Sequence, residues 1–150
     1  MAQNEGFLIQ SKHKFHIDIT PDAAEPTYVR FARGFSSFEP GDNTDTDQTG
    51  YLDGGGLKST SVMGGQITLS FEGHRYYGDP AQDYIFSKQA KVDERLTRFK
   101  WEEPNGKLTE GSATIATIEG PSGEAGSKGE ISVEIHFNGT PTITEPTVTP

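Results

Sequence analysis

The sequence predicts a mainly β fold, an antiparallel β-sandwich or partial barrel with one flanking α-helix. Apolar and polar residues alternate in several short segments, as in residues 15–20 and 130–137, which is typical of strands buried on one face. The 18 glycines and 9 prolines fall largely between these segments. A helix-start signature occurs at one place. Strands joined by turns, with a single helix, indicate an antiparallel sheet.

The alternation predicts strands at residues 15–20, 28–35, 66–72, 95–103, 108–119 and 130–137. In the fourth of these, Thr97, Phe99 and Trp101 share one face, which indicates that this face is buried. The dipeptide Asn105-Gly106 supplies the positive φ angles of a tight hairpin turn to the next strand.

The helix is expected to begin at residue 80 and to end at about residue 90. Asp79 can accept hydrogen bonds from the exposed amides of the first turn, and Pro80 suits the first helical position. Gln82 lies three residues after the cap, as in a capping box.

A long acidic segment occupies about residues 36–56. It contains five acidic residues and no basic one, and it ends in three glycines. Phe38, Tyr51 and Leu52 are its only large apolar anchors. We expect a long loop or an extended hairpin, because unstructured segments of this length in small domains are usually functional or disordered.

Residues 1–139 are expected to form a single domain, since 150 residues suit one domain. Residues 140–150 are rich in threonine and proline, which predicts an extended or disordered C-terminal arm. Only 31% of the residues are hydrophobic, so the core is expected to be thin.

The charge and the cysteine count exclude several classes of protein. With 13 basic and 22 acidic residues the net charge is −9, which disfavours binding to nucleic-acid phosphates. No cysteine is present, so disulfides and thiolate metal sites are excluded. Residues 1–6 lack the features of a signal peptide, and no apolar run is long enough for a membrane helix. We therefore expect no membrane association and a protein made in a reducing compartment.

The acidic segment partly matches a calcium-binding EF-hand loop. Asp45, Asp47, Gly50 and Asp53 fit positions of that pattern, but Gly56 replaces the glutamate at its twelfth position and no helices flank it. The histidines at positions 13, 16, 74 and 136 are dispersed. We expect neither a metal site nor a cofactor.

The chain carries none of the common catalytic motifs. It has no nucleophile elbow, no phosphate-binding loop and no His-Glu-x-x-His helix. We therefore expect a protein that is not an enzyme.

The order of several motifs resembles a known family. A short start, Asn4-Glu5-Gly6, is followed by the acidic segment with Tyr51-Leu52-Asp53-Gly54-Gly55, then Phe71-Glu72-Gly73-His74-Arg75. Next come the turn and helix, residues 77–85, and finally the threonine/proline tail. This order resembles the major tail (tail tube) proteins of long non-contractile-tailed bacteriophages of Gram-positive hosts, the siphophage type.

The resemblance implies a structural virion protein that forms hexameric rings, which stack into a hollow tube for the ejected genome. It further implies location in the virion tail after synthesis in the host cytoplasm. Its partners would be further copies of itself, together with tape-measure, tail-terminator and baseplate proteins. DNA would pass without specific binding, which an acidic wall favours because DNA adheres to basic surfaces.

Two sets of site residues follow as hypotheses from this resemblance. The loop contacting the next ring would use Asp42, Asp45, Asp47, Tyr51, Leu52 and Asp53. The wall of the lumen would use polar positions on the longer strands, namely Glu102, Thr114, Ser132 and Glu134.

Two other interpretations remain open on the sequence. A β-sandwich with exposed Tyr76, Tyr77 or Trp101 suits a carbohydrate-binding or adhesion module. Another virion component, such as a decoration or tail-terminator protein, is the second alternative.

Overall fold

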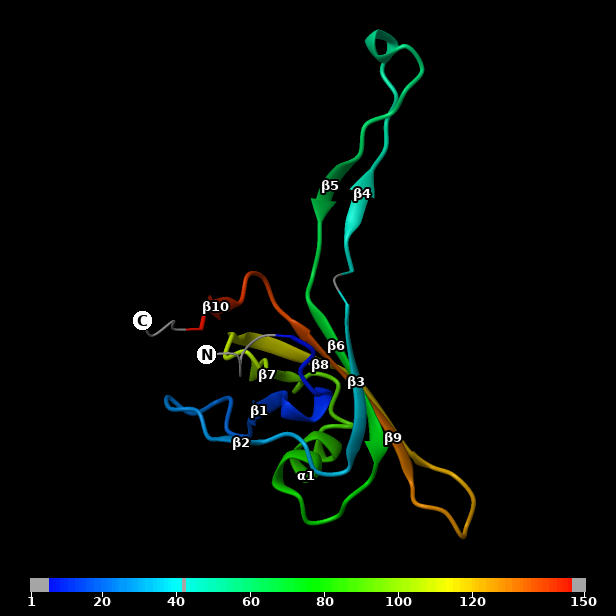
Figure 1. Cartoon of the computed structure of the whole chain (residues 1–150). Coiled ribbons are helices and arrows are strands. Elements are labelled where there is room, and N and C mark those ends of the chain that lie inside the picture. Colours follow the sequence, from blue (N-terminus) through cyan, green and yellow to red (C-terminus); the bar gives the residue numbers. More distant parts are fainter. Residues whose placement is uncertain (1–5, 42, 147–150) are drawn as a thin grey trace.

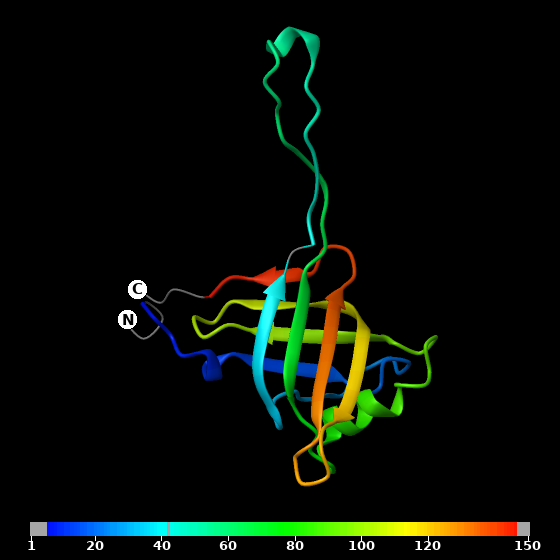
Figure 2. The same cartoon turned by 90° about the vertical axis from the view of Figure 1, so that its right-hand side faces the viewer.

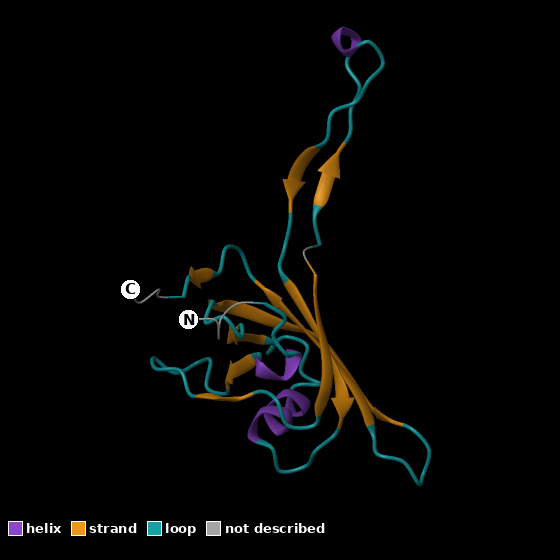
Figure 3. Cartoon of the chain, in the orientation of Figure 1, coloured by secondary structure: helices purple, strands orange, loops and turns teal. Residues whose placement is uncertain are grey.

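The computed structural model describes residues 6–41 and 43–146 of the chain (Figures 1 and 3). The strands and helices, in order, are η2 (Gln10–Lys12), β1 (Lys14–Asp18), β2 (Tyr28–Arg30), β3 (Phe35–Gly41), β4 (Asp45–Asp47), η3 (Leu52–Gly54), β5 (Ser61–Gly64), β6 (Thr68–His74), α1 (Pro80–Ser87), β7 (Leu96–Glu102), β8 (Leu108–Ser122), β9 (Glu130–Phe137) and β10 (Thr142–Thr144). The predicted mainly β, antiparallel architecture with a flanking α-helix is confirmed, and the sheet does not close into a barrel.

One curved sheet forms both layers of the fold. Its strand order is β2-β1-β7-β8-β9-β6-β3, and β10 pairs with the start of β8. The pairing of β8 with β7 ends at Leu96 and Thr114, and a bulge follows between Ile115 and Thr117. The remainder of β8 pairs only with β9 among the described strands. The first layer therefore contains β2, β1, β7 and the first half of β8, and the second contains the rest of β8, β9, β6 and β3 (Figures 1 and 2).

The core between the layers is built mainly from aromatic rings. Phe15 of β1, Phe71 of β6 and Phe99 of β7 are buried and in mutual contact, with the rings of Phe15 and Phe71 edge to face at 4.8 Å. Trp101 is partly buried beside Phe15, so the predicted inner face of β7 is confirmed. Burial of each phenylalanine contributes about 1.5–3 kcal/mol. A few large rings thus compensate for the low apolar content.

Helix α1 begins as predicted and ends earlier. The Asp79 carboxylate accepts the backbone N–H of Gln82 at 3.2 Å, and Pro80 starts the helix. The helix ends at Ser87 rather than near residue 90. The guanidinium of Arg95 donates to the carbonyls of Lys88 and Gln89, so it satisfies groups that another helical turn would have used.

The side chain of Gln82 joins α1 to two loops. Its amide nitrogen donates to the carbonyls of Arg33 (2.8 Å) and His74 (3.1 Å), and its carbonyl accepts the N–H of Tyr76 (2.9 Å). Gln82 is fully buried, so these bonds replace contacts with water. The side chain of Gln82 therefore bridges backbone segments, and its observed bonds replace the one to the Asp79 N–H that the capping box predicts.

Two expected boundaries between strands and loops were wrong. The segment 28–35 is two strands, because Phe31 turns into the core and Gly34 adopts a φ of 88°, which ends β2 at Arg30. The acidic loop expected from residue 36 starts later, since β3 continues to Gly41 with Phe38 against the core. The expected extended hairpin is present beyond that point as β4 and β5.

We predict that Gln82→Ala lowers the free energy of unfolding by about 2–4 kcal/mol, because buried backbone groups lose their partners. Gln89→Ala is the matched control, since Gln89 is exposed and its loss is expected to cost less than about 1 kcal/mol. Urea unfolding followed by circular dichroism measures both values. Equal losses in the two variants would contradict the bridging role of Gln82.

Candidate assembly surfaces

Residues 43–65, here named the projecting hairpin, extend away from the two layers (Figures 1 and 3). Strands β4 and β5 pair in it, an isolated bridge joins Gly50 to Lys58, and η3 forms its tip. Every residue from 43 to 65 is exposed. Isolated two-stranded hairpins are marginally stable in water, so this one is suited to ordering against a partner.

The projecting hairpin carries large apolar side chains that its own chain leaves uncovered. Tyr51 is 67% exposed and Leu52 fully exposed, and Leu57, Val62 and Met63 are 69–81% exposed. Clustered apolar exposure of this kind marks interaction sites. Tyr51 and Leu52 therefore do not anchor the segment to its own domain, whereas Phe38 packs against the core.

The predicted acidic residues of the segment lie along the same projecting hairpin. Asp45, Asp47 and Asp53 are all exposed, and Thr49 donates its hydroxyl to the carboxylate of Asp47 at 2.9 Å. Asp42 lies outside the described residues. Within residues 6–41 and 43–146, no group of three or more histidine or acidic side chains is placed to hold a metal ion.

The second layer has one face on the core and a strongly acidic outer face. Strand register places Glu39, Ser70, Glu134 and Thr117 in one row across β3, β6, β9 and β8, and Ser37, Glu72, Ser132 and Glu119 in the next. We name this surface the acidic face; its five carboxylates are those of Glu39, Glu72, Glu119, Glu130 and Glu134. Strands β3, β6, β8 and β9 contain no lysine or arginine, so they contribute no cationic side chain other than histidine to this face.

The four residues predicted for a lumen wall are divided between the layers. Thr114, Ser132 and Glu134 lie on the acidic face. Glu102 lies on β7, opposite Lys14 of β1, in the other layer. Sequence reasoning missed Glu39, Glu72, Glu119 and Glu130. The last three occupy polar positions in alternating strands, whereas Glu39 lies in the segment that was expected to be a loop.

The first layer carries an outer surface of opposite charge, here named the cationic face. Its members are Lys14, His16, Arg30, Arg98 and Lys100, with Glu102 and Glu110 among them. Lys100 Nζ lies 4.1 Å from the ring centroid of Tyr28, and Arg98 lies 3.7 Å from the buried carboxylate of Asp18. The two outer faces of the sandwich are therefore separated by charge.

Burial lowers the pKa of two histidines in the first layer. For His16 the neighbouring charges of Arg30 and Lys100 lower the pKa further. For His13 burial lowers the pKa and the charge of Glu103 partly opposes it. Trp101 Nε1 donates to His13 Nδ1 at 3.1 Å, which requires that this nitrogen carry no proton.

The acidic layer ends in two strand edges without a partner strand in the described chain. Strand β3 pairs only with β6, and β8 beyond Thr114 pairs only with β9. On the β8 edge, the amide of Gln89 covers the carbonyls of Ile118 (3.3 Å) and Gly120 (3.1 Å). Unpaired edges are templates for pairing with another chain, so both are candidate assembly surfaces.

Comparison with solved structures identifies the fold. The chain superposes on a protein from the tail of an empty gene transfer agent (GTA) particle, solved with C6 symmetry, with a TM-score of 0.71 at 18% identity over 92% of this chain and 99% of that one. It superposes on a chain of the SPP1 tail tube with a TM-score of 0.66 at 13% identity, covering 94% of this chain and 81% of that one. It superposes on a chain of the sheath–tube complex of an extracellular contractile injection system with a TM-score of 0.56 at 15% identity, covering 96% of this chain and 95% of that one.

The order of motifs in the sequence predicted a resemblance to tail tube proteins, and these structural similarities confirm it at the level of the fold. No protein-family model matches the sequence, and no curated protein matches it. Among the described residues, no helix has the length and apolar character needed to cross a membrane.

We predict that the protein loses stability as the pH falls from 7.5 to 5.5. The folded state keeps His13 and His16 neutral, whereas the unfolded chain takes up protons near the ordinary histidine pKa of about 6.5. The unfolded state then binds more protons, so the free energy of unfolding decreases as the pH falls. In the double variant His13→Gln, His16→Gln the urea midpoint should change less between pH 7.5 and 5.5 than in the parent. An equal change in both proteins would show that these histidines do not cause the pH dependence.

Proposed function

We propose that the chain is the structural subunit of a phage-like tail tube, in which rings of subunits stack around a channel for DNA. The observation that carries the proposal is the second layer, which has the core on one face, five carboxylates on the other and an open strand edge at each side. The tail folds of the GTA particle and of SPP1 support it.

The two open edges suit closure into a ring. The four strands β8, β9, β6 and β3 alternate in direction, so β3 of one subunit can pair antiparallel with β8 of the next. A head-to-tail interface of this kind forms a closed ring when its rotation closes. The C6 symmetry of the GTA tail supports six subunits per ring. Pairing replaces the weak cover that Gln89 gives to the β8 edge.

The acidic face would line the channel of such a ring. The opposite face of the same strands is covered by the first layer and by α1, which are too bulky for the inside of a narrow barrel. The uncovered face therefore points inward. Its carboxylates, including Glu39, Glu72 and Glu134, repel the DNA phosphates, so that DNA passes without adhering. Thr114 and Ser132 add neutral polar groups to this wall.

The projecting hairpin would contact the next ring. It leaves the domain where β3 ends and β6 begins, and it continues in their direction beyond the body (Figure 2). Apolar Tyr51 and Leu52 then become buried on stacking, flanked by the carboxylates of Asp45, Asp47 and Asp53. Asp42 belongs to the same proposed contact.

Other tail proteins would complete the assembly. A tube of stacked rings has two ends, which need terminator and baseplate partners, and a lumen that a tape-measure protein can occupy during assembly. The proposed location is the virion tail, after synthesis in the bacterial host cytoplasm. The role is structural rather than enzymatic, and it requires neither cofactor nor metal.

A tube-terminating role is the second candidate. The fold also superposes on a chain of the anti-feeding prophage cap, which terminates a tube, with a TM-score of 0.57 at 14% identity. A terminator would form isolated rings, whereas a tube protein forms extended polymers, so electron microscopy of the purified protein separates the two.

We predict that removing the projecting hairpin abolishes tubes without unfolding the domain. Gly41 and Thr68 are paired neighbours across β3 and β6, so a short glycine turn can replace residues 43–65. The milder variant Tyr51→Ser, Leu52→Ser should reduce tube length while the melting temperature stays within a few degrees of the parent. Negative-stain microscopy and thermal unfolding measure the two effects. Normal tubes from both variants would refute the inter-ring contact.

We predict that Glu72→Lys, Glu134→Lys tubes retain DNA that is protected from nuclease, because the cations would face the channel. Glu102→Lys is the control, since Glu102 lies in the other layer and any DNA it attracts should be digested. Mixing assembled tubes with short duplex DNA at low salt, followed by nuclease treatment and gel analysis, distinguishes the two. Protection of DNA by the Glu102→Lys tubes alone would contradict the proposal, because the channel would then be lined by the first layer and not by the acidic face.

A further inference from the structure

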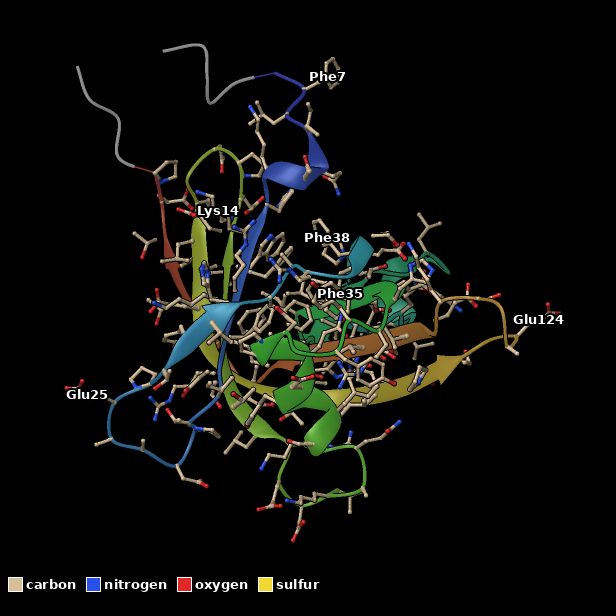
Figure 4. The ribbon with its side chains drawn as sticks, turned by 90° about the horizontal axis from the view of Figure 1, so that it is seen from below. Phe7, Lys14, Glu25, Phe35, Phe38 and Glu124 are labelled. Carbon is tan, nitrogen blue, oxygen red and sulfur yellow. The ribbon has the colours of Figure 1, made fainter. Side chains whose placement is uncertain are left out.

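A groove of about 410 Å³ opens beside the free edge of β3. Its wall includes His13 next to η2, Arg30 and Phe31 where β2 ends, and Phe35 and Phe38 of β3. Figure 4 shows Phe35 and Phe38 on the inner side of β3, whereas Phe7 points away from the domain. The groove therefore lies on the core side of the sheet, opposite the acidic face.

The groove combines aromatic walls with a positive charge. Phe35 and Phe38 are only partly buried, so their rings remain available to an incoming apolar side chain. Arg30, which belongs to the cationic face, is exposed at the rim of the groove where β2 ends. A peptide segment that carries an exposed apolar side chain next to a carboxylate would complement this groove.

Such a segment lies at the opposite side of the same subunit. The α1–β7 loop, defined here as residues 88–95, extends beyond the β8 side of the sheet (Figure 2). Val92 is 81% exposed, and the exposed Asp93 follows it. An apolar side chain this exposed, next to an acidic one, complements the groove in both polarity and charge.

The position of this loop is fixed relative to β8. The guanidinium of Arg95 donates to the carbonyls of Lys88, Gln89 and Ile115, which joins both ends of the loop to the strand. These bonds can persist when an incoming strand displaces the amide of Gln89. The loop follows α1, whose buried residues Ala81 and Ile85 pack into the core, so it also lies on the core side of the sheet.

We propose that, in the ring, the groove of one subunit receives the α1–β7 loop of its neighbour. The inference rests on the proposed pairing of β3 with the neighbouring β8, which brings the groove and the loop together on the core side. Val92 packs against Phe35 and Phe38, and Asp93 faces Arg30. The ring interface then has a side-chain component in addition to its strand hydrogen bonds, which makes it specific for another copy of this chain.

The absence of cysteine from the sequence allows a direct test in assembled tubes. The pair Ser36→Cys, Val92→Cys places one thiol on the groove and one on the loop; both positions are exposed. A short thiol cross-linker should give a ladder of covalent oligomers from the double variant and none from either single variant. The pair Ser127→Cys, Val92→Cys is the control, because Ser127 lies in the β8–β9 loop away from the groove, and it should give no ladder.

Tubes that form without a ladder would overturn the inference and leave the proposed function intact. Failure of the parent protein to form rings or tubes would overturn the proposed function and the inference together. Binding of a small apolar ligand in the groove that leaves ring formation unchanged would also overturn the inference.

Charge reversal supplies a second test that does not depend on cysteine geometry. Arg30→Glu and Asp93→Arg should each raise the protein concentration needed for assembly by roughly tenfold, and the double reversal should restore most of the loss. A double variant no better than the single variants would contradict the contact between Arg30 and Asp93.

Discussion

The structure depends on one strand, β8, that belongs to both layers. Its first half pairs with β7, and after the bulge between Ile115 and Thr117 it continues beside β9 alone. This change of partner folds a single sheet over an aromatic core, and it also leaves the second half of β8 with a free edge. The change of partner along β8 thus forms the domain and also leaves free one of the two edges through which the domain can polymerise.

The same arrangement separates charge within a small protein. Residues facing away from the core on β3, β6, β9 and β8 are acidic or neutral, while those on β1, β2 and β7 include most of the cations near the sheet. Five of the 22 acidic residues therefore lie together on one face, whose strands contain no lysine or arginine. In a closed ring that face would line a channel that repels DNA, and the modest apolar content is consistent with a domain completed by contacts between copies.

The sequence predicted the local features and missed those that depend on register. The alternation at residues 130–137 and the cap at Asp79 were sufficient to predict β9 and α1, because each depends on neighbours in the chain. The split between β2 and β3 was missed because Phe31 and Gly34 act through contacts with the core and α1. Glu102 and Glu134 are alike in pattern, and only strand order shows that they lie in different layers. The projecting hairpin was expected, but the exposure of its tip was not.

The most direct test of the account is a cryo-electron microscopy reconstruction of tubes assembled from the purified protein. We predict closed rings in which β3 of each subunit pairs with β8 of the next, with the carboxylates of Glu39, Glu72 and Glu134 facing an open channel. A reconstruction that places the acidic face on the outer surface of the tube, or in the contact between subunits, would contradict the account.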